Sequence, residues 1–156
     1  MVEPSLNKAR VLLPTAEELY HRLILLVGKP GSGKTVVLHK LADDLDTNVI
    51  NVNLVLAEQL LELTTKQRAL RLPALLELTS NGPEPVCLLD NTEILFDKDL
   101  QHDPLRLLQG ISRNKTVVAA WNGLMNGTSL HYAEIDHPEY RSYDGHGLLI
   151  IEMENS

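Results

Sequence analysis

Short, nearly continuous apolar runs recur along the chain, and between them apolar residues return at helical spacing. Such runs are typical of strands that are buried on both faces of a parallel sheet. They predict strands over residues 23–27, 48–53, 86–90, 116–121 and 148–151. The helical spacing predicts helices over residues 15–22, 55–63 and 66–79, and two more that begin at Lys34 and Pro104. This alternation favours an α/β fold in which helices cover both faces of one sheet.

Turn and capping residues set the expected ends of these elements. Thr15 and Glu18 have the spacing of a capping box, and Pro14 is expected to stop any helix before them. Asp103 and Pro104 have the chemistry of an N-cap and a first helical residue. The segment 123–147 contains several Gly, Pro and Asn residues, so we expect it to be irregular.

The first predicted strand leads directly into a glycine-rich loop. The loop matches the pattern G-x-x-x-x-G-K-[ST] at every fixed position, with Gly28, Lys29, Pro30, Gly31, Ser32, Gly33, Lys34 and Thr35. Glycine lets the backbone come close to an anion, and the N–H groups at the start of the following helix then point toward it. We expect Lys34 to bind the β- and γ-phosphates and Thr35 to ligate Mg²⁺. The sequence therefore predicts an ATP site with magnesium.

A second part of that site is expected at the end of the strand over residues 86–90. This strand ends in Asp90, at the carboxyl edge where open α/β sheets bind ligands. Asp90 would hold the hydration shell of the Mg²⁺ ion opposite Thr35. Cys87 and Trp121 lie in apolar strands, so we expect core roles for both. His131, His137 and His146 match no metal-binding spacing and are expected in loops.

Charge and composition exclude several classes of function. The 156 residues carry 14 Lys and Arg against 21 Asp and Glu, a net charge of −7, and show no basic stripe. Direct DNA binding by the isolated chain is therefore not expected. There is no apolar run long enough for a membrane span and no secretory signal. A single cysteine suits the reducing cytoplasm. We expect one cytoplasmic domain over residues 1–156.

The order of elements points to one branch of the phosphate-loop proteins. A predicted strand and two helices separate the loop from the Asp90 strand, so an additional strand lies between them in sequence. This arrangement resembles the additional-strand division of phosphate-loop ATPases, which includes the AAA+ proteins. The resemblance implies a three-layer fold with a five-stranded parallel sheet in the order 5-1-4-3-2. That division carries a helical lid after the core, which we expect to be absent because the sequence ends at Ser156.

The residues after Asp90 depart from the pattern of that division. A glutamate normally follows the aspartate directly, but here the next residue is Asn91, and Glu93 comes later. Glu93 is either the base that activates water or an ordinary acid at a helix start. By resemblance, Asn122 occupies the place of the polar sensor near the γ-phosphate, although with Gly123 it also has good turn chemistry. Arg141, with Arg113 as a second candidate, would complete the site of a neighbouring subunit.

Other functional classes are weighed against this interpretation. A GTPase is disfavoured because Asp90–Glu93 lacks the glycine of D-x-x-G and no aspartate follows Asn114 and Lys115 as guanine reading requires. A small-molecule kinase remains a rival, although the segment 123–147 holds only Arg141 where such kinases usually carry several arginines. A nucleotide-binding regulatory subunit with negligible turnover is the other alternative.

A further resemblance rests on the loop, the short chain and residues 88–96, which read Leu-Leu-Asp-Asn-Thr-Glu-Ile-Leu-Phe. These features resemble the BrxF family of small phosphate-loop proteins from type 3 BREX phage-defence systems. The resemblance implies a prokaryotic cytoplasmic ATPase that acts with other defence proteins on invading DNA. We therefore expect Mg²⁺-dependent ATP hydrolysis that is weak or partner-dependent, and a homo-oligomer that forms with nucleotide.

Overall fold

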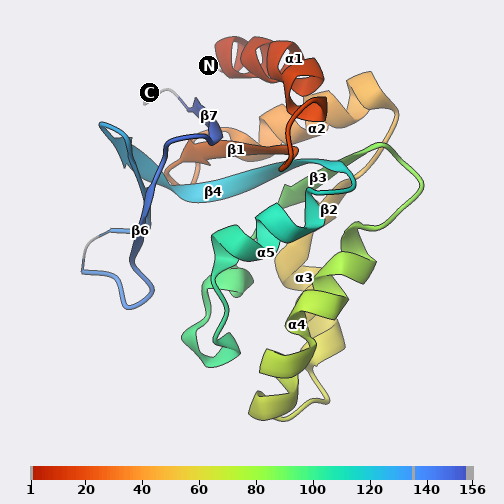
Figure 1. Cartoon of the computed structure of the whole chain (residues 1–156), viewed down its shortest axis with the longest axis vertical. Coiled ribbons are helices and arrows are strands. Elements are labelled where there is room, and N and C mark those ends of the chain that lie inside the picture. The colour runs from red at the N-terminus through yellow and green to blue at the C-terminus, as the bar shows by residue number, and fades with distance from the viewer. Residues whose placement is uncertain (1, 135, 154–156) are drawn as a thin grey trace.

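A twisted parallel sheet forms the centre of the computed structural model, which describes residues 2–134 and 136–153 (Figure 1). Its parallel strands are β1 (Leu23–Gly28), β2 (Val49–Asn51), β3 (Val86–Asp90), β4 (Thr116–Asn126) and β7 (Leu149–Glu152). They lie in the order β2-β3-β4-β1-β7, and each neighbouring pair is parallel. Numbered along the chain, this is the predicted order 5-1-4-3-2, which is confirmed.

Helices cover both faces of the sheet (Figure 1). On one face lie α1 (Glu3–Glu17) and α2 (Lys34–Leu45). On the other lie α3 (Val52–Leu60), α4 (Thr65–Ser80) and α5 (Pro104–Ile111), with the short 3₁₀ helices η1 (Glu93–Phe96) and η2 (Lys98–Leu100). The predicted three-layer α/β architecture is confirmed.

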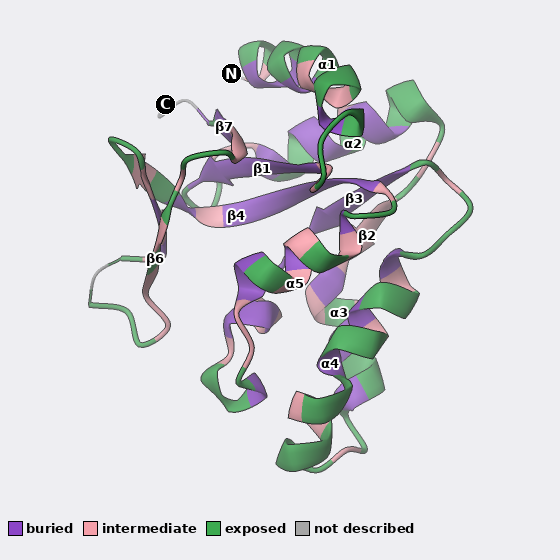
Figure 2. Ribbon diagram, in the orientation of Figure 1, coloured by how far each residue is buried: buried purple, intermediate pink, exposed green. Residues whose placement is uncertain are grey.

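The alternation of side chains along β1 shows how the sheet divides the core. Leu23, Leu25 and Val27 belong to the hydrophobic cluster under α3, α4 and α5, whereas Ile24 and Leu26 belong to the cluster under α1 and α2. The central strands β1 and β3 and the first half of β4 are accordingly buried, whereas the edge strands β2 and β7 are mostly half-buried (Figure 2). A strand with both faces covered must be apolar at every position, which is why this segment is an unbroken apolar run.

Both predicted ends of the first helix are wrong. Instead of a short helix over residues 15–22, α1 runs from Glu3 to Glu17 and contains Pro14. Proline inside a helix costs about 3 kcal/mol because it removes one hydrogen bond and crowds the preceding turn. Burial of Leu6, Ala9 and Ala16 against the sheet and α2 offsets that cost. Tertiary packing therefore extends the helix across a residue that local rules treat as a stop.

The second strand is shorter than predicted. The expected strand over residues 48–53 ends at Asn51, because the Asn51 side chain accepts a hydrogen bond from the backbone N–H of Leu54 and caps α3. Val52, expected inside a strand, is the first residue of α3 and is fully buried. A buried valine is compatible with a strand and with a helix. The hydrophobic pattern alone therefore could not locate the boundary between β2 and α3.

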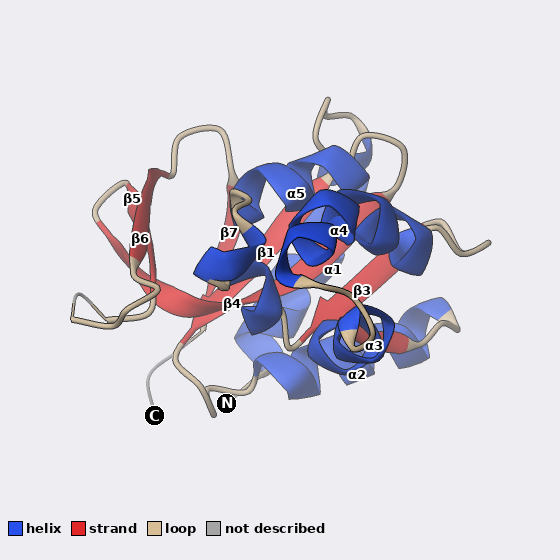
Figure 3. Cartoon of the chain, turned by 90° about the horizontal axis from the view of Figure 1, so that it is seen from below, coloured by secondary structure: helices blue, strands red, loops and turns tan. Residues whose placement is uncertain are grey.

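The segment 123–147 is not irregular as expected. β4 continues past Trp121 to Asn126, pairs antiparallel with β5 (Ser129–Tyr132), and β5 pairs with β6 (Arg141–Asp144). Gly127, with a φ of 62°, provides the positive dihedral for the tight turn between β4 and β5. This antiparallel extension, β4–β5–β6, stands out from one end of the helical layers (Figure 3).

Gly123 offers a test of that extension. A Cβ atom at residue 123 would collide with the backbone carbonyl of His131 on β5. We expect Gly123→Ala to lower the free energy of unfolding by about 2 kcal/mol or more. Gly110→Ala in α5 is the matched control, because a Cβ there meets no atom within 4 Å. The control should stabilise the helix by up to about 1 kcal/mol. Equal denaturation midpoints for Gly123→Ala and wild type would contradict the pairing of β4 with β5.

Candidate nucleotide site

The glycine-rich loop joins the carboxyl end of β1 to the start of α2. Gly31 and Gly33 have φ angles of 81° and 103°, which side chains with a Cβ rarely adopt. Gly33 directly precedes Lys34, the first residue of α2, so the free N–H groups of that helix start face the loop. A Cβ at Gly28 would meet Met153, which follows β7, and one at Gly33 would meet Val2. The loop therefore rests on residues from both ends of the described chain.

Lys34 is folded into this loop. Its side chain is 6% exposed, and Nζ donates hydrogen bonds to the carbonyl oxygens of Gly28 at 2.8 Å and Lys29 at 2.7 Å. Burial lowers the pKa of the Lys34 ammonium group, and the carboxylates of Asp90 and Glu93 act in the opposite direction. An ammonium held this way is positioned for anionic phosphate oxygens at the loop.

Thr35 and Asp90, the two predicted magnesium ligands, are in direct contact. The Thr35 hydroxyl donates a hydrogen bond of 2.7 Å to one carboxylate oxygen of Asp90. The other Asp90 oxygen accepts the backbone N–H of Asn91 at 2.9 Å. A hydroxyl and a carboxylate are the hard oxygen donors that Mg²⁺ prefers. This donor set therefore fits a magnesium ion between α2 and β3.

Glu93 is held by amide side chains on both of its carboxylate oxygens. Asn122 of β4 donates to one oxygen at 2.6 Å, and Asn53 of α3 donates to the other at 3.0 Å. The Asn53 side-chain oxygen also accepts the backbone N–H of Ile94 at 2.7 Å. The structure thus brings together Glu93 and Asn122, as the sequence predicted, and adds Asn53.

Sequence reasoning missed Asn53, although a signal was present. Asn51 and Asn53 are the polar residues where the second apolar run ends, at the same edge of the sheet as Asp90 and Asn122. Because the carboxyl ends of parallel strands converge at one edge of the sheet, polar residues at the end of this run are candidates for the same site as Asp90. Asn53 was missed because residues 48–53 were all predicted to be strand.

The turn between Asp90 and Glu93 is anchored to the neighbouring strand. Thr92 is 2% exposed, and its hydroxyl donates to the carbonyl oxygen of Ala120 in β4 at 2.6 Å. Asn91 has a φ of 52°, in the left-handed region that asparagine tolerates. This tight turn directs Glu93 back toward the loop even though Glu93 does not follow Asp90 directly.

These groups line one cleft of about 340 Å³ at the carboxyl edge of the sheet. Its lining includes Pro30, Gly31, Gly33, Lys34, Thr35, Val36, Asp90, Asn91, Thr92, Glu93, Ala120 and Asn122. The predicted loop, the predicted metal ligands and the predicted water-positioning pair therefore meet around one cleft.

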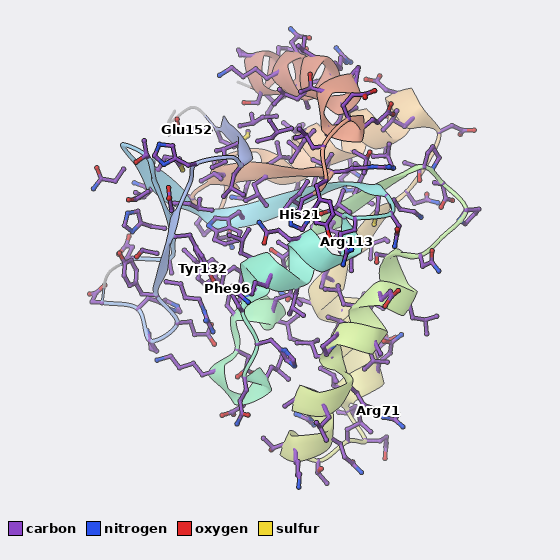
Figure 4. The ribbon with its side chains drawn as sticks, in the orientation of Figure 1. His21, Arg71, Phe96, Arg113, Tyr132 and Glu152 are labelled. Atoms are coloured by element: carbon purple, nitrogen blue, oxygen red, sulfur yellow. The ribbon has the colours of Figure 1, made fainter. Side chains whose placement is uncertain are left out.

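The two candidate arginines are not among the residues that line this cleft. Arg141 begins β6 and pairs in register with Tyr132 of β5. Arg113 lies beyond the end of α5, near His21, with its guanidinium carbon 4.9 Å from the centre of the Tyr20 ring (Figure 4). Arg113 precedes β4 and so lies toward the amino edge of the sheet, away from the cleft. A role for either arginine in a neighbouring subunit stays a prediction.

The remaining residues singled out in the sequence take structural positions. Trp121 is fully buried, and Cys87 is 5% exposed. Burial raises the pKa of the Cys87 thiol to about 11, so it stays protonated and unreactive near neutral pH. Within residues 2–134 and 136–153, no group of three His, Cys, Asp or Glu side chains could hold a metal ion. His131 instead contacts the Tyr140 hydroxyl at 2.6 Å.

Fold and site together define a phosphate-loop NTPase domain. The family model described as the ATPase family associated with various cellular activities (AAA) matches residues 24–139. The match covers most of the chain, which therefore belongs to the AAA family of ATPases. No curated protein matches it. Among the helices that the structure describes, none is long and apolar enough to cross a membrane.

Three larger proteins are among the solved structures that match this chain. The crystal structure of a DNA replication initiation factor aligns with a TM-score of 0.53 and 17% identity over 99% of this chain and 47% of that one. A structure that describes the basis of katanin self-assembly aligns with a TM-score of 0.42 and 20% identity over 78% of this chain and 42% of that one. The structure of C. elegans PCH-2 aligns with a TM-score of 0.41 and 19% identity over 81% of this chain and 37% of that one. The chain spans less than half the length of each. The first similarity concerns the fold alone.

The position of Lys34 generates a direct test of the cleft. We expect Lys34→Ala to weaken ATP binding by at least about tenfold, because it removes the buried cation that would contact the phosphates. Lys40→Ala is the matched control, since Lys40 lies on the same helix but pairs with Glu3 on the surface. Calorimetric titration of each variant with ATP and Mg²⁺ measures the difference. Equal affinity for ATP in both variants would show that nucleotide binds elsewhere.

Proposed function

We propose that this chain binds ATP with Mg²⁺ and hydrolyses it slowly, as a nucleotide-regulated subunit of a larger assembly. One observation carries the proposal: the contact between Thr35 and Asp90 lies in the same cleft as the buried ammonium of Lys34 and the carboxylate of Glu93. Phosphoryl transfer needs little covalent help from a protein and depends on positioning and charge stabilisation. The cleft brings together residues suited to both tasks.

Each group has a defined part in this proposal. Lys34 contacts the β- and γ-phosphates, and the loop N–H groups hold the β-phosphate in place. Thr35 and Asp90 would hold Mg²⁺, which would neutralise charge on the phosphate oxygens. Asn122 lies at the γ-phosphate end, where its amide can donate to a phosphate oxygen or a water. Glu93 accepts the proton of the attacking water.

The contacts of Glu93 explain why the proposed turnover is slow. Each carboxylate oxygen already accepts an amide hydrogen bond, from Asn53 or from Asn122. The two amides occupy about half of the lone-pair sites of the carboxylate, so fewer sites remain for a water that a general base would activate. A contact that draws Asn122 toward the γ-phosphate would free one oxygen of Glu93 for water. ATP hydrolysis would then depend on how a nucleotide or a partner repositions the amides.

The wider role rests on the sequence resemblance of residues 88–96 and on charge. We propose that the chain is a cytoplasmic ATPase of phage defence that works with other defence proteins. Because its net charge is −7, we do not expect it to bind DNA itself. Both hydrophobic clusters share one sheet, which supports a single domain over the described residues. Arg141 or Arg113 from another copy would supply the positive charge that completes the site.

A regulatory subunit with negligible turnover is the second candidate. It is favoured by Asn91 in the position after Asp90 and by the two amide contacts on Glu93. Such a subunit would bind ATP with the same loop, and the bound ATP would alter its interactions with partner proteins without being hydrolysed. Hydrolysis measurements on variants that keep ATP affinity separate it from an ATPase.

Substitution of Glu93 tests the proposed base. We expect Glu93→Gln to lower the rate of phosphate release by about 100-fold, because an amide cannot accept the proton, while ATP affinity is kept. Glu58→Gln on the exposed surface of α3 is the matched control and should hydrolyse at the wild-type rate. Turnover by Glu93→Gln at the wild-type rate would remove Glu93 from the mechanism. Tight ATP binding without turnover in wild type would favour the regulatory subunit.

Assembly gives a separate test of the proposed arginine. We expect the molar mass in solution to rise when ATP and Mg²⁺ are added, because a site completed by a second copy assembles around bound nucleotide. Light scattering with and without ATP measures this, and Arg141→Ala should reduce the rise. A constant monomer mass at saturating ATP would argue against an arginine supplied by another copy.

A further inference from the structure

A second pocket lies beside the nucleotide cleft, where β4 continues beyond Asn122 into the antiparallel extension. Its volume is about 700 Å³, within the range of pockets that bind ligands. It shares Pro30, Glu93 and Asn122 with the nucleotide cleft, so the two hollows meet at these residues. We call it the hairpin pocket.

One wall of the hairpin pocket is apolar and firmly packed. It includes Leu124, Tyr132 and Ala133, from the two strands of the hairpin and the residue that follows β5. Tyr132 is 4% exposed and stacks on Phe96 with ring centres 3.4 Å apart (Figure 4). Trp121 packs against both rings edge to face. Because these aromatic rings fix one another, the wall is a preformed apolar surface rather than a flexible one.

The rim of the hairpin pocket is acidic. Glu134 and Asp136 are exposed and Glu139 is half-buried, all on the segment after β5. Lys29 is the only Lys or Arg among the described residues that line the pocket. Burial, together with the nearby carboxylates of Glu93 and Glu139, raises the pKa of the Tyr132 hydroxyl, so it stays neutral and can donate a hydrogen bond.

We propose that the hairpin pocket docks a segment of a partner protein that presents Arg or Lys beside an apolar side chain. The apolar wall suits the aliphatic part of such a segment, and the rim carboxylates suit its cationic part. A free small molecule fits less well, because the exposed rim would leave much of it in water, whereas small-molecule pockets bury most of their ligand. A second copy of this chain also carries a charge of −7, so a basic partner of different sequence is the better electrostatic match.

The proposal goes beyond nucleotide binding and does not depend on turnover. It has a consequence for the site, because Glu93 and Asn122 line both hollows and Phe96 belongs to η1, the short helix that begins with Glu93. A segment docked in the hairpin pocket would therefore contact Glu93 and Asn122 directly, above the buried ring of Tyr132. Partner binding and the state of the nucleotide cleft would be coupled through direct contacts.

A designed peptide tests the docking proposal with the full chain and without nucleotide. The probe is acetyl-Leu-Arg-Leu-Arg-Leu-amide, titrated into isotopically labelled protein while backbone amide signals are followed by NMR. We expect saturable shifts at Leu124 and Ala133. The double variant Glu134→Lys with Asp136→Lys should weaken binding by about tenfold or more, because it reverses the charge of the rim.

The matched control is Glu17→Lys with Glu18→Lys, which makes the same change in net charge at exposed residues where α1 ends. It should keep the peptide affinity within about twofold of wild type. Equal losses in both double variants, or equal binding of acetyl-Leu-Glu-Leu-Glu-Leu-amide, would reduce the effect to bulk charge and overturn the proposal. Self-association that displaces the peptide would make a second copy the occupant. The titration contains no nucleotide. Its result therefore tests the docking proposal whether or not the chain binds ATP.

Discussion

Parallel pairing of the central strands is the constraint on which the site depends. The register places Gly28 of β1 beside Asn122 of β4, and Asn51 of β2 beside Asp90 of β3. Asn51, Asp90 and Asn122 therefore lie at the same edge, where the helix start of α2 also faces. A shift of register in any pair would separate groups that now hydrogen-bond across it. The chemistry of the cleft is therefore a property of the sheet as much as of the loop.

Polar side chains at that edge form hydrogen bonds with one another and with the loop backbone. Lys34 binds loop carbonyl oxygens, Thr35 binds Asp90, and Glu93 binds both Asn53 and Asn122. Buried polar groups without partners would destabilise the fold, so these contacts are what a folded chain requires. A bound nucleotide would have to replace several of these hydrogen bonds with contacts of its own. This exchange links the stability of the cleft to its proposed regulation, since each contact released costs free energy that the ligand has to offset.

The sequence predicted the parts of the molecule that follow from local chemistry or from strong patterns. The loop over residues 28–35 and Asp90 at the end of an apolar strand have strict local requirements, and the order of the five parallel strands followed from the resemblance they support. The errors arose where distant contacts override local preferences. Pro14 lies inside α1 because Leu6 and Ala16 are buried, and the hairpin after Trp121 was hidden by a glycine-rich composition that also suits irregular chain. Asn53 was missed for a related reason, since its partner Glu93 is remote in sequence.

Met153 and Val2 lie so close to the phosphate loop that a Cβ atom at Gly28 or Gly33 would meet them, and both ends of the described chain therefore approach the loop. The first and last elements of the described chain, α1 and β7, lie side by side (Figure 1). A fluorophore attached at residue 2 or residue 153 would therefore lie next to the loop. Labels at these ends would be well placed to sense the loop as it changes shape, but bulky fusions there would disturb it.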